Sequence, residues 1–259
     1  MKIILFSDVH ANLPALEAFF ADADAQNADA IYCLGDLVGY NIWPNEVVRA
    51  IKKRMIPTIA GNYDDGVGKH SGDCGCAYKT ETDKDNGNIS ISYTNFLIGE
   101  EERAYLRTLP AHMRVEFKLK DTAMTLLLVH GSPRKINEYL FEDREEKSLL
   151  RMMQQASADI MCFGHTHKPY HRGLQGFDPH SSEMRYWHAI NIGSVGKPKD
   201  GDARGCYAVL HLNEDANLIS MGGIGVEFRR FTYDVERAAQ AVENSPLPNA
   251  FADMLRKAY

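Results

Sequence analysis

Short apolar runs alternate with longer stretches of helical periodicity in the first part of the chain. The short runs have the length and flanking turn residues of buried strands, and the longer stretches repeat apolar residues every three or four positions. This βαβαβ order predicts a largely parallel sheet covered by helices. The elements expected here are strand 2–6, helix 13–26, strand 30–34, helix 44–54 and strand 56–60.

The pattern changes after residue 60. Residues 61–76 contain five glycines, and a polar stretch then leads to two expected helices, 88–98 and 100–108, the second ended by Pro110. We interpret residues 63–110 as a loop and helical insertion over one face of a single domain spanning 1–259.

Strands follow one another with few helices between them in the second half of the chain, which predicts a second, more antiparallel sheet packed on the first. The fold class is therefore α/β with two sheets. The elements expected are strands 113–118 and 124–129, helix 142–156, strands 159–163, 185–191, 205–213 and 218–228, and helices 233–243 and 249–258.

Five of the apolar strands run directly into Gly, Asp, Asn or His. In an open α/β sheet the carboxyl ends of the strands form the ligand-binding edge, so these side chains are expected to converge on one crevice. The residues in question are Asp8, His10, Asp36, Asn62, His130, His165 and His167.

This set of side chains is suited to metal binding. Asp8 and His10 are two residues apart, about 6.6 Å in extended chain, so both emerge on one face, and His165 and His167 repeat the arrangement. Mixed imidazole and carboxylate ligands favour Mn, Fe, Zn, Co or Ni over Ca or Mg. Seven ligands are too many for one tetrahedral site. Two divalent metals that share a bridging carboxylate are the simplest arrangement.

The ordered motifs D-x-H, G-D, G-N-x-[DE], a strand-ending His and G-H-x-H resemble those of the calcineurin-like metallophosphoesterase superfamily. The segment Asn191-Ile192-Gly193-Ser194-Val195-Gly196-Lys197-Pro198-Lys199-Asp200-Gly201 is similar to one found in its bacterial branch of small phosphodiesterases. The resemblance implies a four-layer α/β/β/α sandwich with two mixed β-sheets and a dinuclear centre.

The resemblance also implies roles for individual residues. Asp8, His10 and His167 would bind one metal, Asn62, His130 and His165 the other, and Asp36 both. The expected reaction is hydrolysis of phosphodiester or phosphoanhydride bonds by a metal-activated hydroxide. The substrate would be a small phosphorylated molecule, such as a nucleotide or a dinucleoside polyphosphate.

One position departs from the family pattern. Many members have His directly after the Asn, where it protonates the leaving oxygen, whereas Tyr63 follows Asn62 here. A phenol with a pKa near 10 is a weak acid at neutral pH. His70 is a candidate replacement or a solvated loop residue, and Asp64 either supports a metal-bound histidine or forms a turn. The candidate catalytic residues are thus Asn62, Tyr63, Asp64 and His70.

Contacts to the substrate beyond the metals are expected from two residues. Arg134, four positions after His130, is a candidate phosphate ligand or a solvated charge, and Tyr40 follows the Asp36 motif at the expected rim of the pocket. The chain has no G-x-x-x-x-G-K-[ST] sequence, which argues against a P-loop motor or kinase.

Composition limits the partners. The net charge of −6 and the absence of a basic stripe argue against duplex nucleic acid and anionic lipid. No apolar run has the roughly 18 residues of a membrane helix, and no export signal is recognised, so a cytoplasmic location is expected.

Cys74 and Cys76 form a C-G-C pair that is interpreted as loop cysteines, with metal binding or a strained disulfide as alternatives. The oligomeric state is left open.

Two other function classes were weighed. A non-catalytic metal-binding scaffold is disfavoured because all seven ligand positions are filled. A nuclease is disfavoured by the acidic charge balance.

Overall fold

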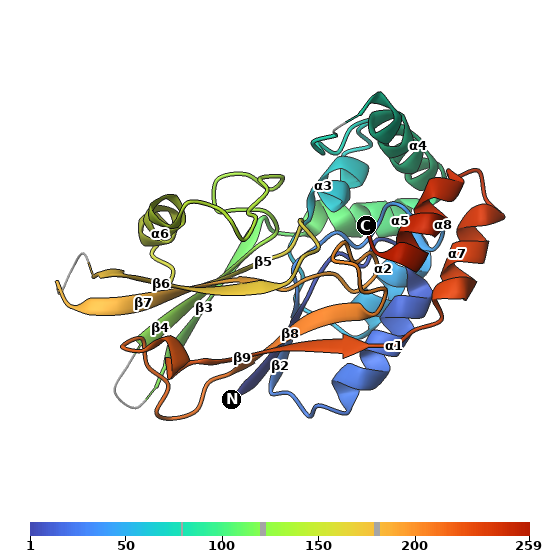
Figure 1. Ribbon diagram of the computed structural model, residues 1–259. Coiled ribbons are helices and arrows are strands. Elements are labelled where there is room, and N and C mark those ends of the chain that lie inside the picture. The colour runs from blue at the N-terminus through green and yellow to red at the C-terminus, as the bar shows by residue number, and fades with distance from the viewer. Residues whose placement is uncertain (79, 120–122, 179–181) are drawn as a thin grey trace.

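A computed structural model of the protein describes residues 1–78, 80–119, 123–178 and 182–259 (Figure 1). In chain order the elements are β1 (Lys2–Phe6), α1 (Leu13–Asp24), β2 (Ala30–Cys33), α2 (Pro44–Lys53), α3 (Asn62–Gly68), α4 (Glu81–Leu97), α5 (Glu100–Thr108), β3 (His112–Lys118), β4 (Ala123–Val129), α6 (Glu146–Gln155), β5 (Ile160–Phe163), β6 (Tyr170–Phe177), β7 (Met184–Asn191), β8 (Gly205–His211), the 3₁₀ turn η1 (Met221–Gly223), β9 (Gly225–Phe231), α7 (Val235–Glu243) and α8 (Asn249–Lys257).

The described strands form two mixed sheets, in agreement with the fold class predicted from the sequence. One sheet has the order β2-β1-β8-β9, with β1 and β2 parallel and the other pairs antiparallel. The other has the order β3-β4-β5-β7-β6, with a parallel centre of β4, β5 and β7 between antiparallel edges. Both sheets therefore carry parallel strands whose carboxyl ends point to a common edge.

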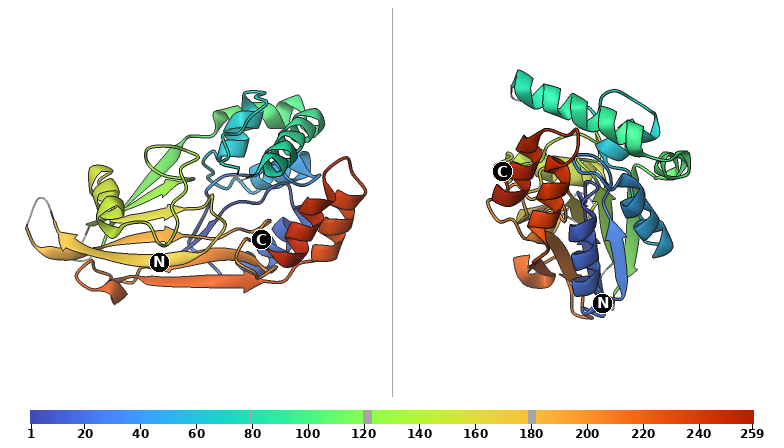
Figure 2. Two further views of the ribbon diagram at one scale, coloured as in Figure 1. Left: turned by 45° about the horizontal axis from the view of Figure 1, so that its top comes forward. Right: turned by 90° about the vertical axis from the view of Figure 1, so that its right-hand side faces the viewer.

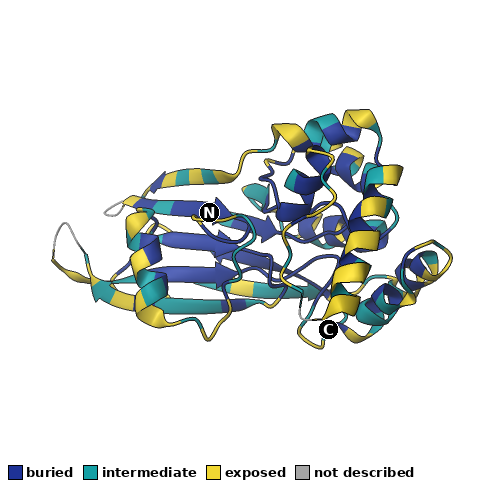
Figure 3. Ribbon diagram, turned by 90° about the horizontal axis from the view of Figure 1, so that it is seen from above, coloured by how far each residue is buried: buried dark blue, intermediate teal, exposed yellow. Residues whose placement is uncertain are grey.

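Alternation of side chains along the strands builds the layers. In β1, Ile3 and Leu5 point into the core between the two sheets, whereas Ile4 and Phe6 point into the core beneath α1 and α2. In β4 the odd and even positions divide in the same way between the inter-sheet core and the core beneath α6. Three stacked cores thus separate four layers, and Figure 3 shows the buried strands beneath helices with exposed outer faces. This confirms the α/β/β/α sandwich.

The C-terminal helices extend the helical layer of the first sheet. Helices α7 and α8 pack on each other, and α7 also contacts α1 (Figure 2). Their shared apolar core includes Phe251 and Leu255 and reaches Tyr40 at the edge of the first core.

The structure corrects the strands expected from the sequence at three places. The segment 56–60 makes only the single bridge between Thr58 and Cys33, because Pro57 lacks a backbone N–H to donate. Strand β6 was not expected from the pattern, since its two glycines lower the apparent strand propensity, yet it pairs along its whole length with β7. The strand expected at 218–228 begins at Gly225, after the η1 turn.

Helices α3, α4 and α5 occupy most of the region interpreted as an insertion. Helix α3 was missed because it lies inside the glycine-rich segment, and α4 begins at Glu81, ahead of the expected residue 88. Helix α3 contacts both α4 and α5. The description of residues 63–110 as an insertion into one domain stays a prediction.

Gly35, at the end of β2, is required by the backbone. Its φ is +89°, and a Cβ there would lie 2.2 Å from the amide nitrogen of Gly61. We predict that Gly35→Ala lowers the free energy of unfolding by about 2–4 kcal/mol, combining the left-handed backbone cost with overpacking. Urea unfolding of the metal-free proteins measures this. Gly72→Ala is the control, because a Cβ at Gly72 meets nothing within 4 Å. Equal stability of Gly35→Ala and wild type would contradict the prediction.

Candidate metal centre

Six of the seven candidate ligands follow strands, and Asn62 follows the segment that bridges to β2 at Thr58. The loop after β1 carries Asp8 and His10, the loop after β2 carries Asp36, and α3 begins with Asn62. The remaining three follow β4 and β5. All seven are buried.

The backbone of these loops is unusual. A positive φ is uncommon for residues other than glycine, and such strain concentrates at functional sites. Five of the seven candidates have φ between 48° and 65°, namely Asp8, His10, Asp36, His165 and His167. These positive φ values occur in the turns that follow the strand ends.

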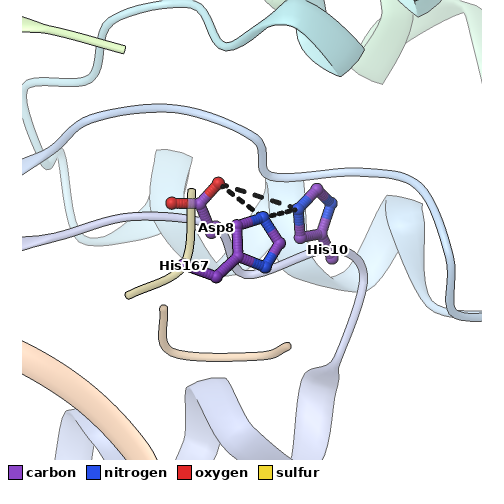
Figure 4. Close-up of side chains that lie close together, drawn as sticks. All are labelled: Asp8, His10 and His167. Atoms are coloured by element: carbon purple, nitrogen blue, oxygen red, sulfur yellow. Dashed lines mark hydrogen bonds and ion pairs between the residues drawn. The ribbon is translucent and has the colours of Figure 1, made fainter. Parts of the chain in front are cut away.

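Asp8, His10 and His167 form the first cluster (Figure 4). The Nε2 atoms of the two histidines are 3.2 Å apart. Asp8 Oδ1 lies 3.2 Å from His167 Nε2 and 3.7 Å from His10 Nε2. Three donor atoms therefore face one point.

Asp36, His130 and His165 form the second cluster. Asn62 joins it, because its Oδ1 lies 3.1 Å from His130 Nε2. The rings of His130 and His165 are in edge contact, with centroids 5.1 Å apart.

Asp36 lies between the two clusters. Its Oδ2 is 3.6 Å from His10 Nε2 and 3.3 Å from His130 Nε2. Its Oδ1 accepts a hydrogen bond from the backbone N–H of Tyr63 at 2.9 Å, which fixes the carboxylate. The geometry matches the bridging position that the family resemblance implies.

Backbone carbonyls orient three of the imidazoles. The Nδ1 atoms of His10, His130 and His167 lie 3.0, 2.8 and 2.5 Å from the carbonyl oxygens of Val38, Leu34 and Lys197. A proton on each Nδ1 donates to these carbonyls, and in the neutral ring this leaves the Nε2 lone pair free. This tautomer is the one that ligates a metal through Nε2.

Buried polar atoms without a hydrogen-bond partner indicate whether these residues fit metal ions. Asp8 Oδ1 and His165 Nε2 are buried and have no hydrogen-bond partner among the described residues. Buried polar atoms are normally paired, so both point to a missing partner. Two cations would satisfy one orphaned atom in each cluster, and the mixed N and O donors suit divalent transition metals. The residues therefore fit a dinuclear centre.

Burial and neighbouring charges shift the pKa values of the titratable groups in different directions. Burial lowers the pKa of His10 and of His165 to about 3, so both are neutral at physiological pH. Burial also acts on His130, but the carboxylates of Asp36 and Asp8 outweigh it and raise its pKa to about 10. Burial raises the pKa of Asp8. The metal-free site thus holds one imidazolium beside its carboxylates.

Tyr63 and Tyr40 border the first cluster. The Tyr63 ring packs on His10 and Tyr40, with centroids 5.6 and 4.8 Å away, and its hydroxyl is buried. Burial raises the pKa of the Tyr63 phenol well above its usual value, which makes it a still poorer acid. Tyr40 lies 4.9 Å from the His10 ring.

Asp64 contacts backbone and not an imidazole. Its two oxygens accept hydrogen bonds from the amides of Leu37 and Gly61, at 2.9 and 3.0 Å. Burial and the nearby Asp36 raise the pKa of Asp64 to about 7. Of the two roles expected from the sequence, the structure shows the turn-forming one, because Asp64 ties the Asp36 loop to the start of α3.

The structure does not bring His70 and Arg134 to the cluster. His70 is exposed and follows α3. Arg134 is paired with Glu138 and lines a surface pocket that contains none of the seven candidate ligands. Within the described part of the chain, neither residue contacts the two clusters.

Several neighbours of the clusters were not assigned from the sequence. Tyr139 packs its ring 4.0 Å from that of His165, and Ser194 Oγ donates to the Asp8 carbonyl at 2.8 Å. Lys197 is 3% exposed, and its ammonium lies 4.6 Å from the Tyr40 ring. The Asn191–Gly201 motif was the available signal for Ser194 and Lys197. Tyr139 carries no local signal, because only the fold brings it to His165.

Comparison with known proteins identifies the class. Residues 1–215 match the family model described as the calcineurin-like phosphoesterase superfamily domain. The chain belongs to this superfamily, and it is a metal-dependent phosphoric ester hydrolase.

Individual relatives cover the whole chain. The uncharacterized protein MJ0912 of Methanocaldococcus jannaschii is 30% identical over 98% of this chain and 96% of its own length. A metallophosphoesterase structure from Sphaerobacter thermophilus is 27% identical, with a TM-score of 0.72 over 100% of this chain and 99% of that one. The hypothetical protein PH1004 of Pyrococcus horikoshii shares the fold, with a TM-score of 0.75, 20% identity and coverage of 100% and 98%. Among the described residues, no helix is long and apolar enough to cross a membrane.

The charge on His130 generates a prediction about proton release. Below a pKa of about 10 the metal-free imidazole is protonated, and it must lose that proton to ligate a metal. We expect binding at pH 7.5 to release about one proton from His130, measured by calorimetry in buffers of different ionisation enthalpy. His130→Ala should remove this release. His165→Ala should keep it, because His165 is already neutral. Equal release by wild type and His130→Ala would show that His130 is not charged in the free protein.

Proposed function

We propose that the protein is a dinuclear phosphoesterase that cleaves phosphodiester or phosphoanhydride bonds of small molecules, such as nucleotides or dinucleoside polyphosphates. The observation that carries the proposal is the pair of donor clusters with Asp36 Oδ2 within 3.6 Å of a histidine Nε2 in each. Mn, Fe, Zn, Co or Ni are the metals that these donors suit.

The ligands divide between two ions. Asp8, His10 and His167 would hold one ion, and Asn62, His130 and His165 the other, with Asp36 shared. When bound, such a pair of ions supplies Lewis acidity, activates the attacking water and stabilises charge on the phosphoryl oxygens. The protein's contribution is to hold the imidazoles in one tautomer through backbone carbonyls and to keep the donor atoms buried.

The surroundings of Lys197 argue for an anionic substrate. Burial and the neighbouring Lys199 lower the pKa of Lys197, and among the described residues its ammonium has no hydrogen-bond or ion-pair partner. Burial disfavours the protonated form of Lys197, and a substrate phosphate beside the amine would favour that form and pair with it. Lys199 lies close enough to Lys197 to act on it electrostatically.

Tyr63 limits the leaving groups that the site can release. A buried phenol with a raised pKa does not protonate the leaving oxygen at neutral pH. Substrates whose leaving groups are stable anions are therefore favoured. Anhydrides and activated diesters meet this condition, and alkyl monoesters do not.

Metal content tests the dinuclear proposal. Elemental analysis of the reconstituted protein should give about two transition metals per chain, and Asp36→Ala should fall to one or none because one carboxylate serves both ions. Asp65→Ala is the control, since Asp65 is in the same helix as Asn62 but pairs with Lys69 at the surface. Saturation of the wild type at one metal would contradict the proposal.

Substrate choice requires a second measurement. The metal-loaded protein should be screened with bis-p-nitrophenyl phosphate, p-nitrophenyl phosphate, cyclic nucleotides and dinucleoside polyphosphates. We expect activity on the diester and the polyphosphates above that on the monoester. Inactivity on all four, with two metals bound, would leave no support for the proposed substrates.

The missing acid generates a prediction about rates. Across a series of aryl phosphodiesters, the rate should rise steeply as the pKa of the leaving group falls, and Tyr63→Phe should keep this slope because the phenol donates no proton. Tyr63→His should flatten it and raise activity on poor leaving groups by up to roughly 10²–10⁴. Gly39 packs against the Tyr63 ring, and an imidazole is smaller than that ring. A shallow wild-type slope that steepens in Tyr63→Phe would identify Tyr63 as the acid.

A further inference from the structure

Cys74 and Cys76 hold their sulfur atoms side by side. The two Sγ atoms are 3.1 Å apart, and both thiols are free. Gly75 between them has a φ of +68°, and this left-handed turn brings the two side chains to the same side of the loop. Cys74 is buried and Cys76 is partly exposed, so a small reagent reaches the pair through Cys76.

The loop that carries the thiols is fixed on both sides. The Gly75 amide donates to Asp73 Oδ1 at 2.8 Å, and the Gly75 carbonyl accepts from Asn137 Nδ2 at 2.7 Å. These bonds hold the turn in place and keep the sulfurs together before any reaction. Cys33, Cys162 and Cys206, by contrast, are buried and spread over the strand layers.

The pair also touches the metal centre. Asn62 Nδ2 donates to the Cys74 carbonyl at 3.0 Å and to Cys76 Sγ at 3.3 Å. The other atom of the same amide, Oδ1, faces His130 Nε2 at 3.1 Å. The Cys74–Gly75–Cys76 turn therefore sets the orientation of a candidate metal ligand.

We propose that Cys74 and Cys76 are a redox modification site, in which a reversible disulfide between them weakens metal binding at the cluster that contains Asn62. The oxidant is a low-molecular-weight disulfide. One thiolate of the pair attacks it and displaces one thiol, and the other cysteine then displaces the second thiol from the mixed disulfide. The protein loses two electrons and two protons, which leave with the two released thiols.

Bond formation changes the contact to Asn62. A disulfide needs its sulfurs at about 2.05 Å, so they must approach by about 1 Å, and Cys76 Sγ is drawn toward Cys74. The Asn62 amide then loses a sulfur partner that helps to hold it. Loss of a contact that orients a metal ligand costs about 10–100-fold in metal affinity. Only this second half of the proposal rests on the proposed dinuclear function.

The disulfide itself is tested without metal. The metal-free protein is treated with oxidised glutathione, alkylated with iodoacetamide and digested, and the peptide containing both cysteines is weighed. We expect a peptide two hydrogens lighter than the reduced form with no alkyl group, and its return to the doubly alkylated form after dithiothreitol. Cys74→Ser should instead stop at a glutathione adduct on Cys76. Full alkylation of both cysteines in wild type after oxidation would overturn the proposal.

Metal affinity tests the link to Asn62. Competition with a chelating dye should show the tighter and weaker Mn²⁺ affinities of the reduced protein, one of which falls by about 10–100-fold on oxidation. The Cys74→Ser, Cys76→Ser double variant keeps an acceptor near Asn62 and should not respond to the oxidant. An oxidised wild type with unchanged affinities would overturn the link. If the reduced protein binds no Mn²⁺, the dinuclear function fails while the mass result still decides the disulfide.

A thiolate metal site is the competing interpretation. It predicts a Zn²⁺ equivalent beyond the two expected, retained in Asp36→Ala and lost in the double variant. That result would overturn the redox proposal.

Discussion

Two carboxylates, those of Asp8 and Asp36, lie buried within reach of four imidazoles. Placing like charges out of water costs free energy, and the surrounding structure offsets part of this cost. In the metal-free protein a protonated His130 offsets part of that cost, and its raised pKa is the sign of it. The remaining imidazoles are kept neutral by burial. A site of this composition carries an excess of lone pairs and a deficit of positive charge, so it is complementary to cations.

The geometry of the site depends on strained turns that the layers hold in place. Residues such as Asp8 and Asp36 adopt left-handed backbone conformations that cost of order 1–3 kcal/mol each. They persist because the strands before them are locked in two sheets and because the turns contact each other. Gly35 lies against Gly61, and Asp64 ties the two loops together through backbone amides. The stable sandwich thus holds the side chains of the candidate ligands in fixed positions.

The sequence pattern predicted that these seven side chains lie together, because six of them follow strands whose ends converge. It could not separate residues whose roles depend on partners from distant segments. Arg134 has the position of a phosphate ligand in the sequence, but Glu138 neutralises it in the loop. His70 lies near Asn62 in sequence, yet α3 carries it to the surface beside Glu100. Strand β6 was hidden by its own glycines and is defined by pairing with β7.

One side chain, Asn62, connects the second donor cluster to Cys74 and Cys76. Asn62 is the only neutral, non-aromatic ligand among the seven candidates, and an amide oxygen attracts a cation less than a carboxylate does. In the proposed centre its orientation depends on how its Nδ2 is fixed, and both hydrogen bonds of Nδ2 go to Cys74 and Cys76. Thiol chemistry would therefore act on Asn62, whereas three of the four imidazoles are oriented by backbone carbonyls. Control at Asn62 would adjust one ion and leave the Asp8 cluster intact.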